Sequence, residues 1–353
     1  MSEEIKNQEI IDNACIDMPT ETSAISLDCE RKNMRRAVSR CGWAVFIATA
    51  TSFLWSFLLT YDILHGININ NYLYFNELFV GVSFLVGSLA LVGMPKKRPE
   101  RKPIKIKSIL ALFCVCATIG TAGNIIGNLI LSVWNFVTGG SAANPLNDVV
   151  MYSSPISMII CMGVLAPLLE ELFFRKLLID RLYPYGETTA ILVSAVAFGL
   201  FHQNFSQFFY AFGIGVLLAY LYCKSGSYKA VVLLHMAFNF VMGVIPAILS
   251  KDVLTFYEEL EALSESVSFE QMLPLLTAYA LPLLLYMCYL AVNCGLNVTG
   301  VIVFCTNFKK ISIEKTESEL TLRERLVAVT VNVGVIAAVL LLTVMMFLSL
   351  VTV

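Results

Sequence analysis

Apolar runs long enough to cross a lipid bilayer recur from Gly42 onward, and they constrain the fold more than any other feature. A transmembrane helix needs about 20 mostly apolar residues. With 58% hydrophobic and 14% charged residues, the chain is far more apolar than a soluble domain. We therefore expect an all-α, polytopic integral membrane helical bundle of about eight or nine transmembrane helices, a multi-pass protein of the cell membrane. The candidate spans are residues 42–60, 73–94, 108–136, 150–170, 188–203, 207–223, 229–249, 272–293 and 326–351.

Composition divides the chain into four parts. Residues 1–41 are polar and cannot bury a core, so they are predicted to be a disordered cytoplasmic tail. Residues 42–136 hold the N-terminal transmembrane helices and residues 270–351 the C-terminal ones. Residues 148–249 lie between them and carry polar groups inside apolar runs, which makes them the predicted functional core. The span near 150–170 is expected to continue as one helix to about Leu182.

Lysine and arginine residues gather in alternate loops. Segment 95–107, PKKRPERKPIKIK, is strongly basic, whereas segments 61–72 and 137–149 contain no lysine or arginine. Since cytoplasmic loops are enriched in these residues, the pattern predicts a cytoplasmic N-terminus. The acidic loop 251–270 then lies on the opposite side. The short pair of runs over 188–223 could be re-entrant, which leaves the side of the C-terminus open.

Charged residues interrupt the fourth run at LLEELFFRKLL, residues 168–178. Charges in hydrocarbon are rare and usually mark function. Glu171 and Arg175 are four residues apart, so they lie on one helical face and can neutralise each other. Glu170 is rotated by about 100° from Glu171 and has no such partner on its own helix.

Two further runs each contain a histidine. Phe198 and His202 are four residues apart, and so are His235 and Asn239, so each pair shares a helical face. Singly, each group has a structural explanation as a buried ion pair or an interhelical hydrogen bond. Together with Glu170 they fall on three neighbouring helices, at depths that can converge on one level nearer the cytoplasm.

These side chains suit hydrolysis by activated water. A carboxylate beside an imidazole can take a proton from water, and a second imidazole with an amide can stabilise an oxyanion. Glu170, His202 and His235 could equally hold Zn²⁺, which would activate the water itself. Asn239 offers an amide, a poor zinc ligand, so on balance we expect no required cofactor.

Three motifs resemble one known family. EELFFR (170–175) fits EExxxR, FGLFH (198–202) fits FxxxH, and HMAFN (235–239) fits HxxxN. In this order the motifs resemble those of the CPBP intramembrane proteases, the type II CAAX prenyl endopeptidase or Abi family. That family includes bacteriocin-processing and immunity members and is often labelled as metalloendopeptidases. The resemblance covers about residues 148–249.

The resemblance implies a membrane-embedded endopeptidase. Glu170 and His202 would activate water, while His235 and Asn239 would form the oxyanion hole. The implied partners are membrane lipid and a peptide or protein substrate, either a lipidated CAAX-type tail or a bacteriocin precursor, and no nucleic acid.

The remaining motif residues would have supporting roles. The resemblance implies that Glu171 and Arg175 brace the helix and that Phe198 shapes the wall of the site. Lys176 departs from the glycine that often follows the arginine in the family. The alternative is a non-catalytic membrane immunity or transport protein that uses the same polar groups for binding.

Overall fold

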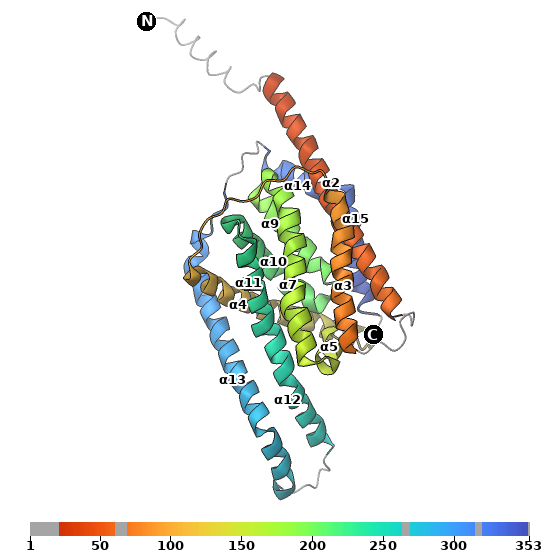
Figure 1. Cartoon of the computed structure of the whole chain (residues 1–353), viewed down its shortest axis with the longest axis vertical. Helices are drawn as coiled ribbons and strands as arrows, with labels where there is room; N and C mark the ends of the chain where they lie inside the picture. The colour runs from red at the N-terminus through yellow and green to blue at the C-terminus, as the bar shows by residue number, and fades with distance from the viewer. Residues whose placement is uncertain (1–20, 61–68, 263–268, 315–319, 352–353) are drawn as a thin grey trace, which may run out of the picture.

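The chain folds into an elongated helical bundle (Figure 1). This computed structural model describes residues 21–60, 69–262, 269–314 and 320–351. Every regular element in that part of the chain is a helix. Seven of these helices are long and apolar enough to cross a membrane, or eight if the bent pair α14 (Leu322–Thr330) and α15 (Val333–Leu348) is one span. The predicted polytopic membrane bundle is confirmed.

Helix α2 begins earlier than composition predicts. It spans Glu21–Thr60, so residues 21–41 are helical instead of disordered, while residues 1–20 lie outside the described part. Met34 and Val38 are fully buried and Cys41 nearly so. Their spacing of four and three residues places them on one face, which packs against the rest of the bundle. Basic residues lie between these positions in the sequence, so composition alone did not indicate the buried apolar face.

Helix α4 (Ile106–Thr138) packs closely against two other helices, α10 (Phe205–Ser225) and α13 (Phe269–Asn307). A Cβ atom at Gly123 of α4 would clash with the backbone nitrogen of Tyr210. A Cβ atom at Gly300 of α13 would clash with the carbonyl oxygen of Cys114. Small residues therefore allow these backbones to approach, as is common between membrane helices.

The fourth predicted span is one helical rod, Pro155–Tyr185, as the sequence predicts. Two π-helical segments interrupt its α-helical pitch on either side of the short α7 (Ala166–Glu171). Such segments are frequent at functional sites because they change the direction of side chains. The short helix α5 (Leu146–Tyr152) precedes this rod. From N- to C-terminus the elements of the rod are α6 (Pro155–Met158), η2 (Ile159–Leu165), α7, η3 (Leu172–Ile179), α8 (Asp180–Leu182) and η4 (Tyr183–Tyr185).

Helices α9 and α10 form a consecutive pair of unequal length. Helix α9 (Glu187–Phe201) has 15 residues, or about 22 Å, less than the hydrocarbon thickness of about 30 Å. The turn that follows it has Gln203 at a φ of 58°, and the Asn204 side chain caps α10 by accepting a hydrogen bond from the backbone N–H of Gln207. Phe201 at the end of α9 and Asn204 in the turn are both buried, so α9 ends inside the bundle.

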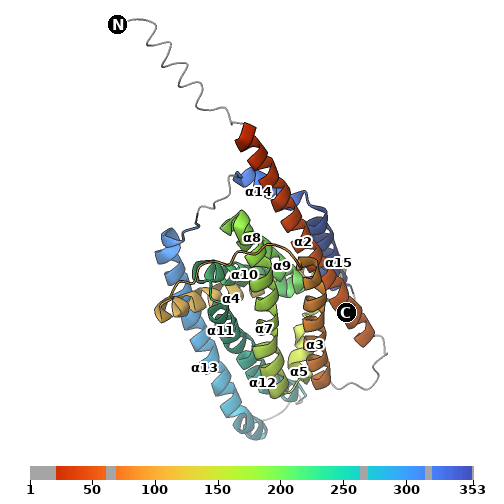
Figure 2. The ribbon, with the colours of Figure 1, turned by 45° about the horizontal axis from the view of Figure 1, so that its top comes forward.

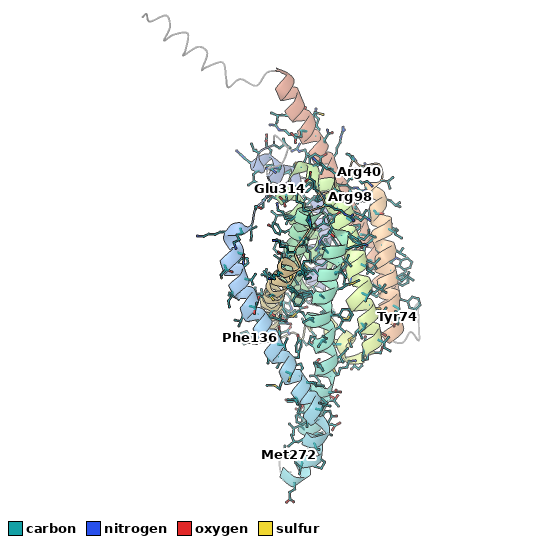
Figure 3. All side chains as sticks on the ribbon, turned by 60° about the vertical axis from the view of Figure 1, so that its left-hand side comes forward. Arg40, Tyr74, Arg98, Phe136, Met272 and Glu314 are labelled. Carbon is teal, nitrogen blue, oxygen red and sulfur yellow. The ribbon has the colours of Figure 1, made fainter. Side chains whose placement is uncertain are left out.

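The next helix continues in α11 (Tyr228–Asn239), η5 (Phe240–Val244) and α12 (Ile245–Glu261). Helices α12 and α13 lie side by side and extend beyond the other helices at one end (Figures 1 and 2). Met272 of α13 lies at that end, whereas Arg40, Arg98 and Glu314 lie toward the opposite end (Figure 3).

Ion pairs at this opposite end tie separate segments together. The Lys102 ammonium lies 2.9 Å from the Glu314 carboxylate, and Lys224 lies 2.8 Å from Glu187. The backbone N–H of Glu314 also donates to Glu187 at 2.6 Å. The hydrogen bond from Lys102 and the charge of Lys224 lower the pKa of the Glu314 carboxyl. The segment after α13 is thereby fixed to the start of α9 and the end of α10.

Candidate active site

A cavity of about 450 Å³ lies within the bundle and contains the polar residues singled out from the sequence. Helices α3, α4, α7, α10, α11 and α13 contribute to its wall, together with the end of α9. Five motif residues line it: Glu170, Phe198, His202, His235 and Asn239. The structure therefore brings together side chains from three motifs that are up to 69 residues apart in sequence (239 − 170).

The two adjacent glutamates face different surroundings. The Glu170 side chain is 15% exposed and lines the cavity. The Glu171 side chain is fully buried and does not line it. Consecutive helical residues point about 100° apart, so one carboxylate can face the cavity while the other faces the packed interior.

Glu171 pairs with Arg175 inside the protein. The Nε of Arg175 lies 3.1 Å from Oε2 of Glu171, and both side chains are fully buried. No guanidinium N–H is aligned for a hydrogen bond with a described residue. The guanidinium carbon instead lies 4.5 Å from the centroid of the Phe198 ring, a cation–π contact. Arg175 therefore neutralises Glu171 and packs against the wall of the cavity.

His235 lies between the two glutamates. Its Nδ1 is 2.9 Å from Oε1 of Glu171, and its Nε2 is 3.7 Å from Oε2 of Glu170. A carboxylate only accepts hydrogen bonds, so Nδ1 carries the hydrogen in this pair. The hydrogen bond to Glu171 thus sets the orientation of the ring and directs Nε2 toward Glu170 and the cavity.

His202 is oriented by its own helix. Its Nδ1 lies 2.9 Å from the carbonyl oxygen of Phe198, one turn earlier. A carbonyl oxygen cannot donate, so Nδ1 holds the hydrogen and the Nε2 of the neutral ring is an acceptor. The Phe198 ring contacts both imidazoles edge to face, with centroids 5.1 Å from His202 and 5.8 Å from His235.

Asn239 has one free donor. Its Nδ2 donates to the carbonyl oxygen of Met162 in η2 at 2.8 Å. An amide nitrogen has two hydrogens, so one remains for a ligand in the cavity. The bond to Met162 also fixes which end of the amide carries the nitrogen.

The cavity also contains polar residues that the motifs did not indicate. Glu77 of α3 (Ile69–Ser88) lines it, and a charged residue within a predicted span is the signal that could have identified it. Tyr210 of α10 lines it as well, and its hydroxyl oxygen accepts a hydrogen bond from Gln207 at 2.8 Å. Asn293 of α13 is a further polar residue of the lining. Tyr210 and Asn293 gave no signal because single uncharged polar residues are common in membrane helices.

The side chains considered as zinc ligands fit that role poorly. Within the described residues, no group of three or more His, Cys, Asp or Glu side chains is arranged to hold a metal ion. Glu170 and His235 approach each other, but His202 does not complete a ligand set with them. A catalytic zinc ion usually has three protein ligands.

Known proteins are similar to the segment of the chain that contains the motifs. Residues 152–241 match the family described as type II CAAX prenyl endopeptidase Rce1-like. Over 171 residues the chain is 25% identical to the membrane-embedded CAAX protease MroQ of Staphylococcus aureus (strain USA300), an alignment that covers 45% of this chain and 69% of that relative. No solved structure matches the chain. The matched segment contains all three motifs, and over this segment the chain is similar to the type II CAAX prenyl endopeptidases of the CPBP family.

Proposed function

We propose that this protein is an intramembrane endopeptidase that hydrolyses peptide bonds with a water molecule activated by Glu170 and His202. The observation that carries the proposal is the position of Glu170, which faces the cavity beside His235 while Arg175 pairs with the neighbouring Glu171. A carboxylate not neutralised by a neighbouring cation is available as a base.

In the proposed reaction, Glu170 accepts a proton from water while Nε2 of His202 orients the same molecule. The resulting hydroxide attacks the carbonyl carbon of the scissile bond. Nδ2–H of Asn239 and, when both nitrogens carry hydrogen, Nε2–H of His235 stabilise the oxyanion. Collapse of this intermediate expels the amine, which takes the proton back from Glu170.

The choice of water as nucleophile rests on the lining of the cavity. Neither serine nor cysteine is among the described residues that line it. The residues give no direct support for a metal-dependent route, because the three side chains considered do not form a ligand set.

We place the cavity in the cell membrane with the N-terminus in the cytoplasm. Arg98 of the basic segment 95–107 and Glu314 lie toward the end of the bundle opposite Met272 (Figure 3), which fits the enrichment of lysine and arginine on the cytoplasmic side. The substrate is proposed to be a peptide or protein segment. A lipidated CAAX tail and a bacteriocin precursor are the candidates that the family suggests.

Cleavage of a peptide library by the purified protein tests the proposal. Products would be identified by mass spectrometry in ¹⁸O-labelled water, with Glu170→Ala protein as the control. We expect products that carry labelled oxygen at their new C-terminus, from the wild type alone. No cleavage, or equal cleavage by both proteins, would favour the alternative of a non-catalytic immunity or transport protein.

A further inference from the structure

Glu77 is a carboxylate in the cavity that the proposed reaction does not use. It lies on α3, outside the segment 152–241 that matches the family. Its side chain lines the cavity, yet the residue is only 9% exposed. A nearly buried charge within a membrane span is costly, and such residues usually serve function.

The packing of α3 places Glu77 near the reacting groups. Glu77 and Gly81 are four residues apart and share a helical face. A Cβ atom at Gly81 would lie 3.4 Å from the Leu169 side chain, so this face packs on α7 next to Glu170. The carboxylates of Glu77 and Glu170 are close enough to interact electrostatically. Two acidic groups therefore share one region of the cavity.

No cation of the described chain pairs with Glu77. The Asn76 side chain is its hydrogen-bond partner, and no salt bridge joins it to a described residue. The described lining of the cavity contains neither lysine nor arginine. Arg175 is committed to Glu171 and to the Phe198 ring. The positive charge that would complement Glu77 is therefore left for a ligand to supply.

We infer that Glu77 forms a subsite for a cationic side chain of the substrate, a lysine amine or an arginine guanidinium close to the scissile bond. This inference rests on the proposed function, because that function places the scissile bond beside Glu170. What the cavity binds is a separate claim. The same carboxylates repel an acidic side chain of the substrate. The preferred substrate is then a segment with a basic side chain close to the scissile bond.

Binding to a protein without the catalytic base tests the subsite independently of turnover. The probes are fluorescent dodecapeptides of leucine, alanine and phenylalanine, each with one lysine, norleucine or glutamate at a scanned position. In Glu170→Gln protein we expect at least one lysine peptide to bind at least about tenfold more tightly than its norleucine analogue. In Glu77→Gln/Glu170→Gln protein the ratio should fall to about one, and in Glu77→Asp/Glu170→Gln protein it should be partly restored. A control with Glu259→Gln, on the distant α12, should keep the preference.

Three results would overturn the inference: equal binding of lysine and norleucine peptides, no binding of either, or a preference that survives loss of Glu77. Cleavage of the same peptides by wild-type protein then separates the two proposals. Lysine-selective binding without cleavage contradicts the endopeptidase but supports the subsite. Cleavage of glutamate peptides as fast as lysine peptides supports the endopeptidase and contradicts the subsite.

Discussion

Nδ1 of His235 lies 2.9 Å from Oε1 of Glu171, and this contact joins helices α11 and α7 through two residues that are 64 positions apart in the sequence. Glu171 is therefore held by His235 on one side and by Arg175 on the other. The carboxylate that pairs most closely with its neighbours is the one outside the cavity. Glu171 thus orients the groups of the site, and Glu170 is left to react.

Loss of the Glu171 charge should destabilise the protein. Glu171→Gln leaves Arg175 without its counter-ion in a fully buried setting, which should cost roughly 3–5 kcal/mol. Thermal unfolding in detergent measures the change. Glu314→Gln is the matched control, because that carboxylate pairs with Lys102 at the exposed end of the bundle and should cost less than about 1 kcal/mol. Equal losses in the two variants would contradict the structural role of Glu171.

Removal of the Asn239 amide should slow catalysis more than it weakens binding. If Nδ2–H stabilises an oxyanion, Asn239→Ala should lower kcat by about 10²–10³ with little change in KM. Steady-state kinetics on a cleaved peptide measure both constants. A rise in KM at unchanged kcat would assign Asn239 to substrate binding. Thermal unfolding of the same variant reports separately on the lost hydrogen bond to Met162.

Activity should not require a metal ion. Among the residues that the structure describes, Glu170, His202 and His235 do not form a set of ligands for a metal ion. Treatment with a chelator should therefore leave turnover unchanged. Metal analysis of the active, purified protein accompanies the assay. Stoichiometric zinc whose removal abolishes activity, and whose return restores it, would show that the metal-dependent route is the correct one.

The charge distribution predicts the orientation in the membrane. A reporter fused at residue 100 should be cytoplasmic, and reporters at residues 143 and 260 should be external. Residue 100 lies in the basic segment, whereas residue 260 lies in α12 near the protruding end. Cysteine accessibility in intact cells would provide the same measurement without a fusion. A reversal at any one of the three positions would contradict the proposed orientation.

The helices were predictable because hydrocarbon leaves the backbone few alternatives. The apolar runs predicted the helical bundle and the long span that the structure shows at Pro155–Tyr185. The start of α2 was not predicted, since Met34 and Val38 are buried by tertiary packing against other helices. The π-helical segments η2 and η3 on either side of α7 also left no sequence signal, because their pitch depends on packing along the whole rod.

The candidate site was predictable only where helix geometry decides the contact. The four-residue spacing of Glu171 and Arg175 places them side by side on any regular helix. The contact of His235 with Glu171 depends on how α11 packs against α7, which spacing within one helix cannot show. Glu77 lines the cavity from α3, outside the motif region. Its position there could not be predicted without knowing how α3 packs in the fold.

The most direct test of the account compares turnover by Glu170→Gln and Glu171→Gln proteins at matched folded concentration. Glu170→Gln keeps the size of the side chain and removes the base, so kcat should fall by at least about 10² while thermal stability stays near that of the wild type. Glu171→Gln should lower stability and yield. Its amide oxygen can still accept the hydrogen bond from Nδ1 of His235, so activity per folded molecule should be largely retained. An active Glu170→Gln protein beside a folded but inactive Glu171→Gln protein would show that the two glutamates have the opposite roles.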